Sequence, residues 1–167
     1  MKILISSDGF HAHYFQRMSW LRAFNECGIM ASLWDCNNIS AFDAFDSFEP
    51  DIFLGQSYNL TPPLIKCIYE RPHLKVGLRA GDWGDFAPHK RFNVLYCSQS
   101  EISALKKLKD ETGKPDFVHI HYDQEAVEKT HTRFSTIGID AKSLTMCANV
   151  HEFVKPSYSE NLFCDIG

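Results

Sequence analysis

The chain has 167 residues, of which 44% are hydrophobic and 13% aromatic, and it carries a formal net charge of −4. This length suits one domain with a well-packed core, and the composition excludes global disorder. No long basic stretch supports a nucleic-acid-binding surface, and no run approaches the roughly 20 apolar residues of a membrane span.

Short apolar, β-branched segments alternate along the chain with longer segments of helical periodicity. Strands are expected at Lys2–Ser6, Met30–Trp34, Asp51–Leu54, Leu74–Arg79, Asn93–Cys97, Phe117–His121 and Lys142–Met146. Helices are expected at Ala12–Cys27, Ala41–Phe48, Pro62–Glu70, Glu101–Thr112 and Gln124–Ile137. This alternation predicts the α/β class: a Rossmann-like, three-layer α/β/α domain with a mostly parallel sheet of about seven strands.

Residues at the predicted helix ends support these assignments. Gly28, Gly113 and Gly138 each follow a helix, where a left-handed terminal residue is common. Thr61 followed by Pro62 is typical of an N-cap and a first helical position. In the first helix, an apolar stripe at helical spacing is expected to face the core. It consists of Tyr14, Met18, Leu21 and Phe24.

The cysteines bear on the cellular compartment. There are six, and none forms a CxxC pair, which argues against a zinc ribbon or a thioredoxin-like site. Scattered thiols of this kind predict reduced cysteines in a cytoplasmic protein. The apolar run at the amino terminus stops at Ser6, which is too short for a secretory signal.

Ligands of parallel sheets bind beyond the carboxyl ends of the strands, so the loops at those ends carry the candidate site. These loops hold Asp8, Gly9, His11, His13, Gln56, Tyr58, Asn59, Asp82, Trp83 and Ser98. Hydrogen-bonding side chains beside aromatic rings suit a sugar or another polyhydroxylated ligand. Each residue alone also has an ordinary interpretation as part of a turn or loop. The prediction therefore depends on their shared position at one edge of one sheet.

Several familiar motifs are missing from the sequence. It contains no GxGxxG dinucleotide fingerprint and no GxxxxGK[ST] phosphate loop. It also contains no DxD triplet, which argues against a metal-clamped sugar-nucleotide enzyme.

One further pattern keeps an alternative function open, and a second alternative stands beside it. His119, His121 and Asp123 spell HxHxD, and a strand would place all three on one side. Imidazoles and a carboxylate suit zinc, so a metal-dependent hydrolase is one alternative. In the structural interpretation, one histidine packs in the sheet and the other caps the loop. A non-enzymatic, flavodoxin-like binding module is the second alternative function.

Three long segments resemble a known family. MKILISSDGFHAHYFQRMSWLRAF and FEPDIFLGQSYNLTPPLIKCIYERPHLKVGLRAGDWG resemble the amino-terminal half of GT-B glycosyltransferases, in particular the spore-maturation-type, glycosyltransferase-family-1-like proteins. LTMCANVHEFVKPSYSENLFCDIG resembles their crossover between two Rossmann-like domains. The resemblance implies that residues 1–150 form an acceptor-side domain. It also implies that residues 151–167 begin the crossover to a donor domain that this chain lacks.

The resemblance also implies a reaction. Such enzymes move a sugar from a nucleotide-sugar, acting as co-substrate, to an acceptor hydroxyl on a saccharide or other compound, without metal or cofactor. In inverting members a histidine or an acid deprotonates that hydroxyl, a role that suits a group titrating near neutral pH. The resemblance assigns this role to His13 first and His11 second, with Asp8 or Asp82 orienting the imidazole. Without the donor domain, the chain alone is expected to transfer sugar weakly or not at all.

Overall fold

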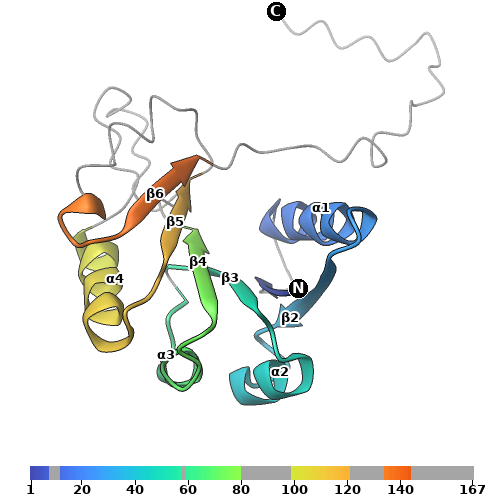
Figure 1. Ribbon diagram of the computed structural model, residues 1–167, viewed down its shortest axis with the longest axis horizontal. Coiled ribbons are helices and arrows are strands. Elements are labelled where there is room, and N and C mark those ends of the chain that lie inside the picture. Colours follow the sequence, from blue (N-terminus) through green and yellow to red (C-terminus); the bar gives the residue numbers. More distant parts are fainter. Residues whose placement is uncertain (8–11, 58, 80–98, 121–133, 144–167) are drawn as a thin grey trace, which may run out of the picture.

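The structure is a computed structural model that describes residues 1–7, 12–57, 59–79, 99–120 and 134–143. Its strands are β1 (Lys2–Ser7), β2 (Met30–Asp35), β3 (Ile52–Gln56), β4 (Lys75–Arg79), β5 (Phe117–Ile120) and β6 (Asp140–Ser143). Its helices are α1 (Ala12–Glu26), α2 (Ala41–Phe48), α3 (Pro62–Tyr69) and α4 (Gln99–Thr112). From β1 to β5, strands and helices alternate as the sequence predicts (Figure 1).

The six strands form one parallel sheet in the order β2-β1-β3-β4-β5-β6. The chain moves outward from β1 to β2, returns past β1 to β3, and then continues in the opposite direction. The connections therefore change direction between β1 and β3, which is the switch point of a doubly wound sheet. Right-handed crossovers then require α1 on one face and the later helices on the other.

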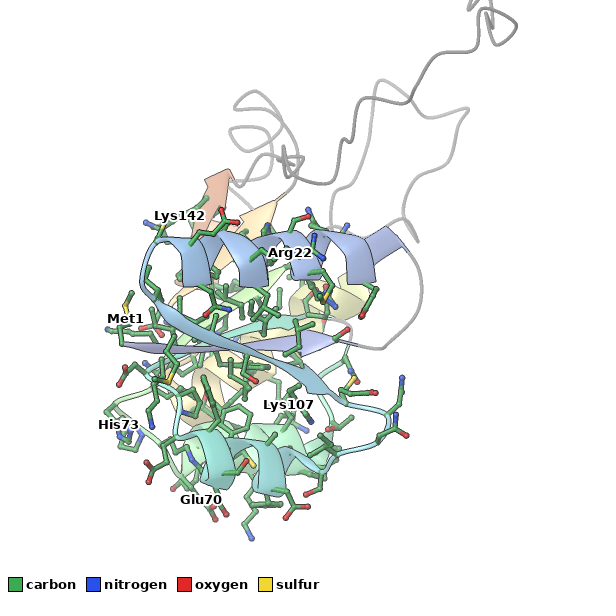
Figure 2. All side chains as sticks on the ribbon, turned by 90° about the vertical axis from the view of Figure 1, so that its right-hand side faces the viewer. Met1, Arg22, Glu70, His73, Lys107 and Lys142 are labelled. Atoms are coloured by element: carbon green, nitrogen blue, oxygen red, sulfur yellow. The ribbon has the colours of Figure 1, made fainter. Side chains whose placement is uncertain are left out.

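The two apolar cores show the three layers. On one face, Trp20, Leu21 and Phe24 of α1 pack against Ile3, Ile5 and Leu54 of the sheet. On the other face, α2, α3 and α4 cover a larger core, which includes Phe45, Phe53, Leu64, Leu105 and Val118. Figure 2 shows α1 and the α2–α3 layer on opposite sides of the sheet. The predicted Rossmann-like α/β/α class is therefore confirmed.

Two strands need comment against the prediction. Six strands lie in the described residues rather than about seven, and the expected strand at Asn93–Cys97 falls outside them. The last strand begins at Asp140 instead of Lys142, because the chain passes from the left-handed Gly138 (φ 71°) directly into pairing with Phe117. The expected helix at Gln124–Ile137 also falls mostly outside the described residues.

The helix ends follow the predicted chemistry. Gly28 and Gly113 adopt positive φ angles of 74° and 71° after their helices. Thr61 has the extended backbone of an N-cap, with proline following it, but its side chain makes no capping bond. At the start of α2 the Ser40 hydroxyl does cap, accepting from the Asp43 N–H at 3.1 Å.

Asp116 links the start of β4 to the segment before β5. Its carboxylate accepts from the Val76 N–H at 2.7 Å and lies 3.1 Å from the Lys114 ammonium nitrogen. Burial acts to raise the pKa of the Asp116 carboxyl, but the Val76 amide and the Lys114 charge outweigh it and hold that pKa below its usual value. No helix among the described residues has the length and apolar character to cross a membrane.

Candidate functional site

Three polar side chains lie in register across the carboxyl edge of the sheet. Gln56 of β3 pairs with Arg79 of β4, and Arg79 pairs in turn with His119 of β5. Paired residues of neighbouring parallel strands project to the same face and lie one strand spacing apart, about 4.8 Å. Gln56, Arg79 and His119 therefore form a continuous line, here called the polar row.

The alternation of each strand decides which face the polar row occupies. On β3, Ile52 and Leu54 belong to the core beneath α1, so Gln56 two residues later faces α1 as well. Phe117 on β5 packs in the same core and places His119 on that face. The polar row thus continues, at the carboxyl edge, the apolar surface on which α1 lies.

Helix α1 contributes two side chains that contact the row. The Gln56 amide lies against the Arg17 guanidinium, and with its oxygen turned toward α1 it accepts from Arg17 Nη1 at 3.2 Å. Trp20 packs edge-to-face on His119, with ring centroids 5.4 Å apart and planes at 69°. Because Arg17 and Trp20 are three residues apart, they share one face of the helix.

Burial is the unusual property of this group. Arg17, Gln56, Arg79 and His119 are exposed by only 2%, 4%, 8% and 2%. An arginine is charged at every ordinary pH, and a buried charge is costly unless polar groups or opposite charge compensate it. Two buried guanidinium groups beside one amide therefore require a strongly polar, acceptor-rich environment.

Ser7 ends β1 beside the polar row. Since Ile5 pairs with Leu54, continuing the register places Ser7 level with Gln56. Ser7 is only 3% exposed, and its carbonyl oxygen accepts from the Cys36 N–H at 2.9 Å and from the Cys36 thiol at 3.1 Å. Its hydroxyl adds another hydrogen-bonding group at the same edge of the sheet.

The structure places only some of the predicted site residues. Gln56 lies at the carboxyl edge as predicted, and His13 lies in the first turn of α1, directly after that edge. The other predicted residues lie outside the described part of the chain: Asp8, Gly9, His11, Tyr58, Asp82, Trp83 and Ser98.

Asn59 lies at the same edge but in a separate location. With Trp34, Cys36 and Thr61 it lines a cavity of about 290 Å³ next to the first residues of α2 and α3. Its amide nitrogen donates to the Cys36 sulfur at 3.4 Å. Gln56 and Asn59, predicted to line one cleft, thus face the α1 side and the α2–α3 side of the sheet.

Sequence reasoning missed Arg17 and Arg79. Arg79 ends a strand in which Val76, Gly77 and Leu78 are buried one after another, so a charged residue directly after this buried run was the available signal. Arg17 lies four residues before Leu21, within the spacing of the apolar stripe of α1. The members of that stripe are only half-buried, whereas Arg17 is almost fully buried. Leu21 and Phe24 of the stripe pack on the core as predicted, but the stripe did not indicate that Arg17 is buried beside them.

The HxHxD pattern is only partly visible in the structure. His119 is buried in the sheet against Trp20, as the structural interpretation expects, while His121 and Asp123 lie outside the described residues. Within the described part of the chain, no three His, Cys, Asp or Glu side chains are placed to hold a metal ion. The hydrolase alternative stays a prediction.

Comparisons with known proteins add little to this geometry. No protein-family model matches the chain, and no curated protein matches it. Among solved structures, the chain is similar to a cysteine-to-alanine mutant of flavodoxin from Pseudomonas aeruginosa. The identity is 14% and the TM-score 0.36, with 90% of this chain and 86% of that chain covered. A likeness at this level carries no argument about ligand or activity.

Proposed function

We propose that this chain is the acceptor-binding half of a metal-independent glycosyltransferase. The observation that supports the proposal is the polar row, which sets an amide, a guanidinium and an imidazole in register at the carboxyl edge of a parallel sheet. Ligands of such sheets bind at this edge. These three groups are suitable hydrogen-bonding partners for the hydroxyl and ring oxygens of a saccharide.

The proposed catalytic base is His13. It belongs to the first turn of α1, the helix that follows β1 at the edge occupied by the polar row. A histidine titrates near neutral pH and can take the proton of an acceptor hydroxyl as that oxygen attacks the anomeric carbon. His11 is the second candidate for the base, and Asp8 or Asp82 would orient the imidazole. The nucleotide-sugar would be held by a second Rossmann-like domain.

Binding by the full chain tests the proposal directly. Neutral monosaccharides and disaccharides, and then a panel of sugar nucleotides, are titrated into the protein and followed by two-dimensional NMR of backbone amides. The proposal expects a saccharide to shift the amides around Gln56 and to bind more tightly than any sugar nucleotide. Saturation by a sugar nucleotide with no response to any saccharide would contradict the assignment of this chain to the acceptor side.

Two amide variants localise the binding. Gln56→Ala should weaken saccharide binding by about tenfold, the value of roughly one hydrogen bond. Asn38→Ala should leave the affinity unchanged, because Asn38 is an exposed amide near the same edge whose side chain donates to Asp35 instead. Equal saccharide affinities in the two variants would contradict the placement of the acceptor site at the polar row.

A separate variant tests the base. Any transfer that the chain supports should fall about 100-fold in His13→Ala, whereas saccharide affinity should stay unchanged. Unchanged turnover would exclude His13 from the role.

A further inference from the structure

The cavity beside Asn59 lies at the carboxyl edge of the sheet, on the face opposite α1. It measures about 290 Å³ and is bounded by the end of β2, the start of α2 and the segment that leads into α3. Helices α2 and α3 lie side by side on this face (Figure 1). Ligands of parallel sheets bind beyond the carboxyl ends of the strands. The cavity therefore has the position of a binding site, separate from the polar row.

Apolar side chains form much of the wall of this cavity. Trp34 lines it although the ring is almost fully buried, so the cavity reaches down to the larger core. Ile39, Ala41 and Pro63 complete the apolar lining. An apolar cavity of about 150 Å³ is enough to bind benzene. A space of about 290 Å³ can therefore hold one six-membered ring together with a substituent.

The described residues that line the cavity carry no charge, and the nearest charge with a contact to them is negative. The carboxylate of Asp43, in the first turn of α2, accepts from the hydroxyl of the lining residue Ser40 at 2.7 Å. Pro62 and Pro63 at the start of α3 have no N–H groups to offer an anion. An ionised ligand would lose its hydration without meeting an opposite charge on the wall, which is costly. The lining therefore favours an uncharged ligand.

Two polar groups on the wall are placed to hold such a ligand. The Asn59 NH₂ group donates to the Cys36 sulfur at 3.4 Å, while no donor within the described part of the chain reaches the Asn59 side-chain oxygen. The Thr61 hydroxyl makes no capping bond, and Pro63 at the second helical position offers it no N–H. A carbonyl acceptor and a hydroxyl two residues apart suit one O–H group of a ligand.

We propose that this cavity binds an uncharged ring compound that carries a hydroxyl group, such as a phenol or an aromatic alcohol. The ring would lie against the apolar lining. Its hydroxyl would donate to the side-chain oxygen of Asn59 and accept from the hydroxyl of Thr61. This inference goes beyond the proposed function and does not depend on it, because it concerns the other face of the sheet and uses none of the residues of the polar row.

Four probes built on one ring test the inference: benzyl alcohol, toluene, benzoate and benzylamine. They share the benzene ring and one attached carbon, and they differ in the polar group and its charge. Each is titrated into the full chain at neutral pH and constant ionic strength, followed by two-dimensional NMR. We expect benzyl alcohol to bind saturably. Benzoate and benzylamine should each bind at least tenfold more weakly than benzyl alcohol, because they are ionised at this pH.

An amide variant tests the polar contact. Asn59→Leu replaces the amide by an apolar side chain of similar size. It should weaken the binding of benzyl alcohol by about tenfold, the value of roughly one hydrogen bond, without weakening that of toluene. Asn38→Leu is the matched control and should change neither affinity, because Asn38 is an exposed amide that donates to Asp35 and does not line the cavity. Thr61→Val, which removes only the hydroxyl, should give a smaller loss for benzyl alcohol.

A measurement on the unmodified protein locates the ligand and covers the case in which a variant does not fold. The Trp34 indole N–H donates to the Ile39 carbonyl oxygen at 2.8 Å, and both residues line the cavity. In protein labelled with ¹⁵N-tryptophan, benzyl alcohol should shift the indole N–H signal of Trp34. The signal of Trp20 should stay in place, because Trp20 packs on the opposite face of the sheet.

The possible outcomes separate this inference from the proposed function. The inference is overturned if benzyl alcohol does not saturate the protein, if either ionised probe binds as tightly, or if Trp20 responds instead of Trp34. Equal affinities of Asn59→Leu and Asn38→Leu for benzyl alcohol would also overturn it. A saccharide response at Gln56 without binding of benzyl alcohol would leave the proposed function standing. Binding of benzyl alcohol at Trp34 without any saccharide response would contradict the proposed function alone.

Discussion

The ring of Phe53 occupies the space next to Gly55 on β3. Replacing Gly55 with alanine therefore tests the packing of the larger core. A Cβ atom at position 55 would lie 2.6 Å from Cε1 and 2.7 Å from Cζ of Phe53. Phe53 is fully buried and packs on Phe45 and Trp34, with ring centroids 5.2 and 6.1 Å away. The ring cannot withdraw without displacing its neighbours.

The size of the effect follows from two opposing terms. Forcing an extra methyl group into a well-packed core costs about 1–3 kcal/mol. Replacing glycine by alanine also restricts the unfolded chain, which returns about 0.4–1 kcal/mol. We therefore expect Gly55→Ala to lower the free energy of unfolding by roughly 1–2 kcal/mol. The measurement is urea-induced unfolding followed by far-UV circular dichroism, with the slope of the transition unchanged.

A double-mutant cycle assigns the effect to the named contact. Phe53→Leu removes the two ring atoms that the new methyl group meets, so Gly55→Ala should cost at least 0.5 kcal/mol less in that background. Gly77→Ala is the matched control, because its Cβ would lie 2.5 Å from Cζ of Phe117, a ring that is only half-buried and can turn outward. A neutral or stabilising Gly55→Ala, or equal costs in both backgrounds, would refute the reasoning.

Three further predictions concern stability and reactivity. Ser40→Ala should lower the free energy of unfolding by about 1 kcal/mol, because it removes a capping bond, whereas Thr61→Ala should cost clearly less in the same urea titration. Asp116→Asn should be less stable than the wild type above about pH 4, and the difference should shrink as the pH falls through the lowered pKa of the folded Asp116 carboxyl; a difference that stays constant down to pH 2 would contradict this. Burial raises the pKa of the Cys67 thiol, so native protein should be alkylated by iodoacetamide at the exposed Cys27 long before Cys67, as measured by peptide mass spectrometry.

Most of the fold could be predicted because local signals and tertiary packing agree. The apolar runs at β1 and β3 are each buried as continuous strands, and α2 begins and ends at the residues that its periodicity predicts. Even Gly28 and Gly113 adopt the left-handed backbone expected at those helix ends. The start of β6 was missed by two residues, because the first apolar run after Gly138 is interrupted by Asp140 and Lys142.

The candidate site was predictable only as a location. Ligands of parallel sheets bind beyond the carboxyl ends of the strands, and this rule selected Gln56 as a residue expected in a loop. The structure places Gln56 at the end of β3, in the polar row. Arg17 lies in a helix and Arg79 in a strand. Both were missed because the sequence analysis searched for site residues only in the loops that follow the strands. Register across strands decides that Arg79 meets Gln56 on one side and His119 on the other, and register is a tertiary property that one strand does not encode.

Helix α1 buries a charged residue beside its apolar contacts. Trp20, Leu21 and Phe24 pack on the sheet, yet Arg17 of the same helix is buried more deeply than Leu21. Conflicts between local pattern and global burial are expected at functional sites, where stability is sacrificed for chemistry. Arg17 contacts Gln56 at the polar row, so α1 combines apolar packing on the sheet with a polar contact at the candidate site.

The position of α1 relates the proposed base to the polar row. Arg17 and Trp20 of one helix face contact Gln56 on β3 and His119 on β5. Position 13 lies four residues before Arg17, about 6 Å along the helix axis and on the same face. If His13 is the base, the reacting hydroxyl of the acceptor must lie about one helical turn from the position of Arg17 at the polar row.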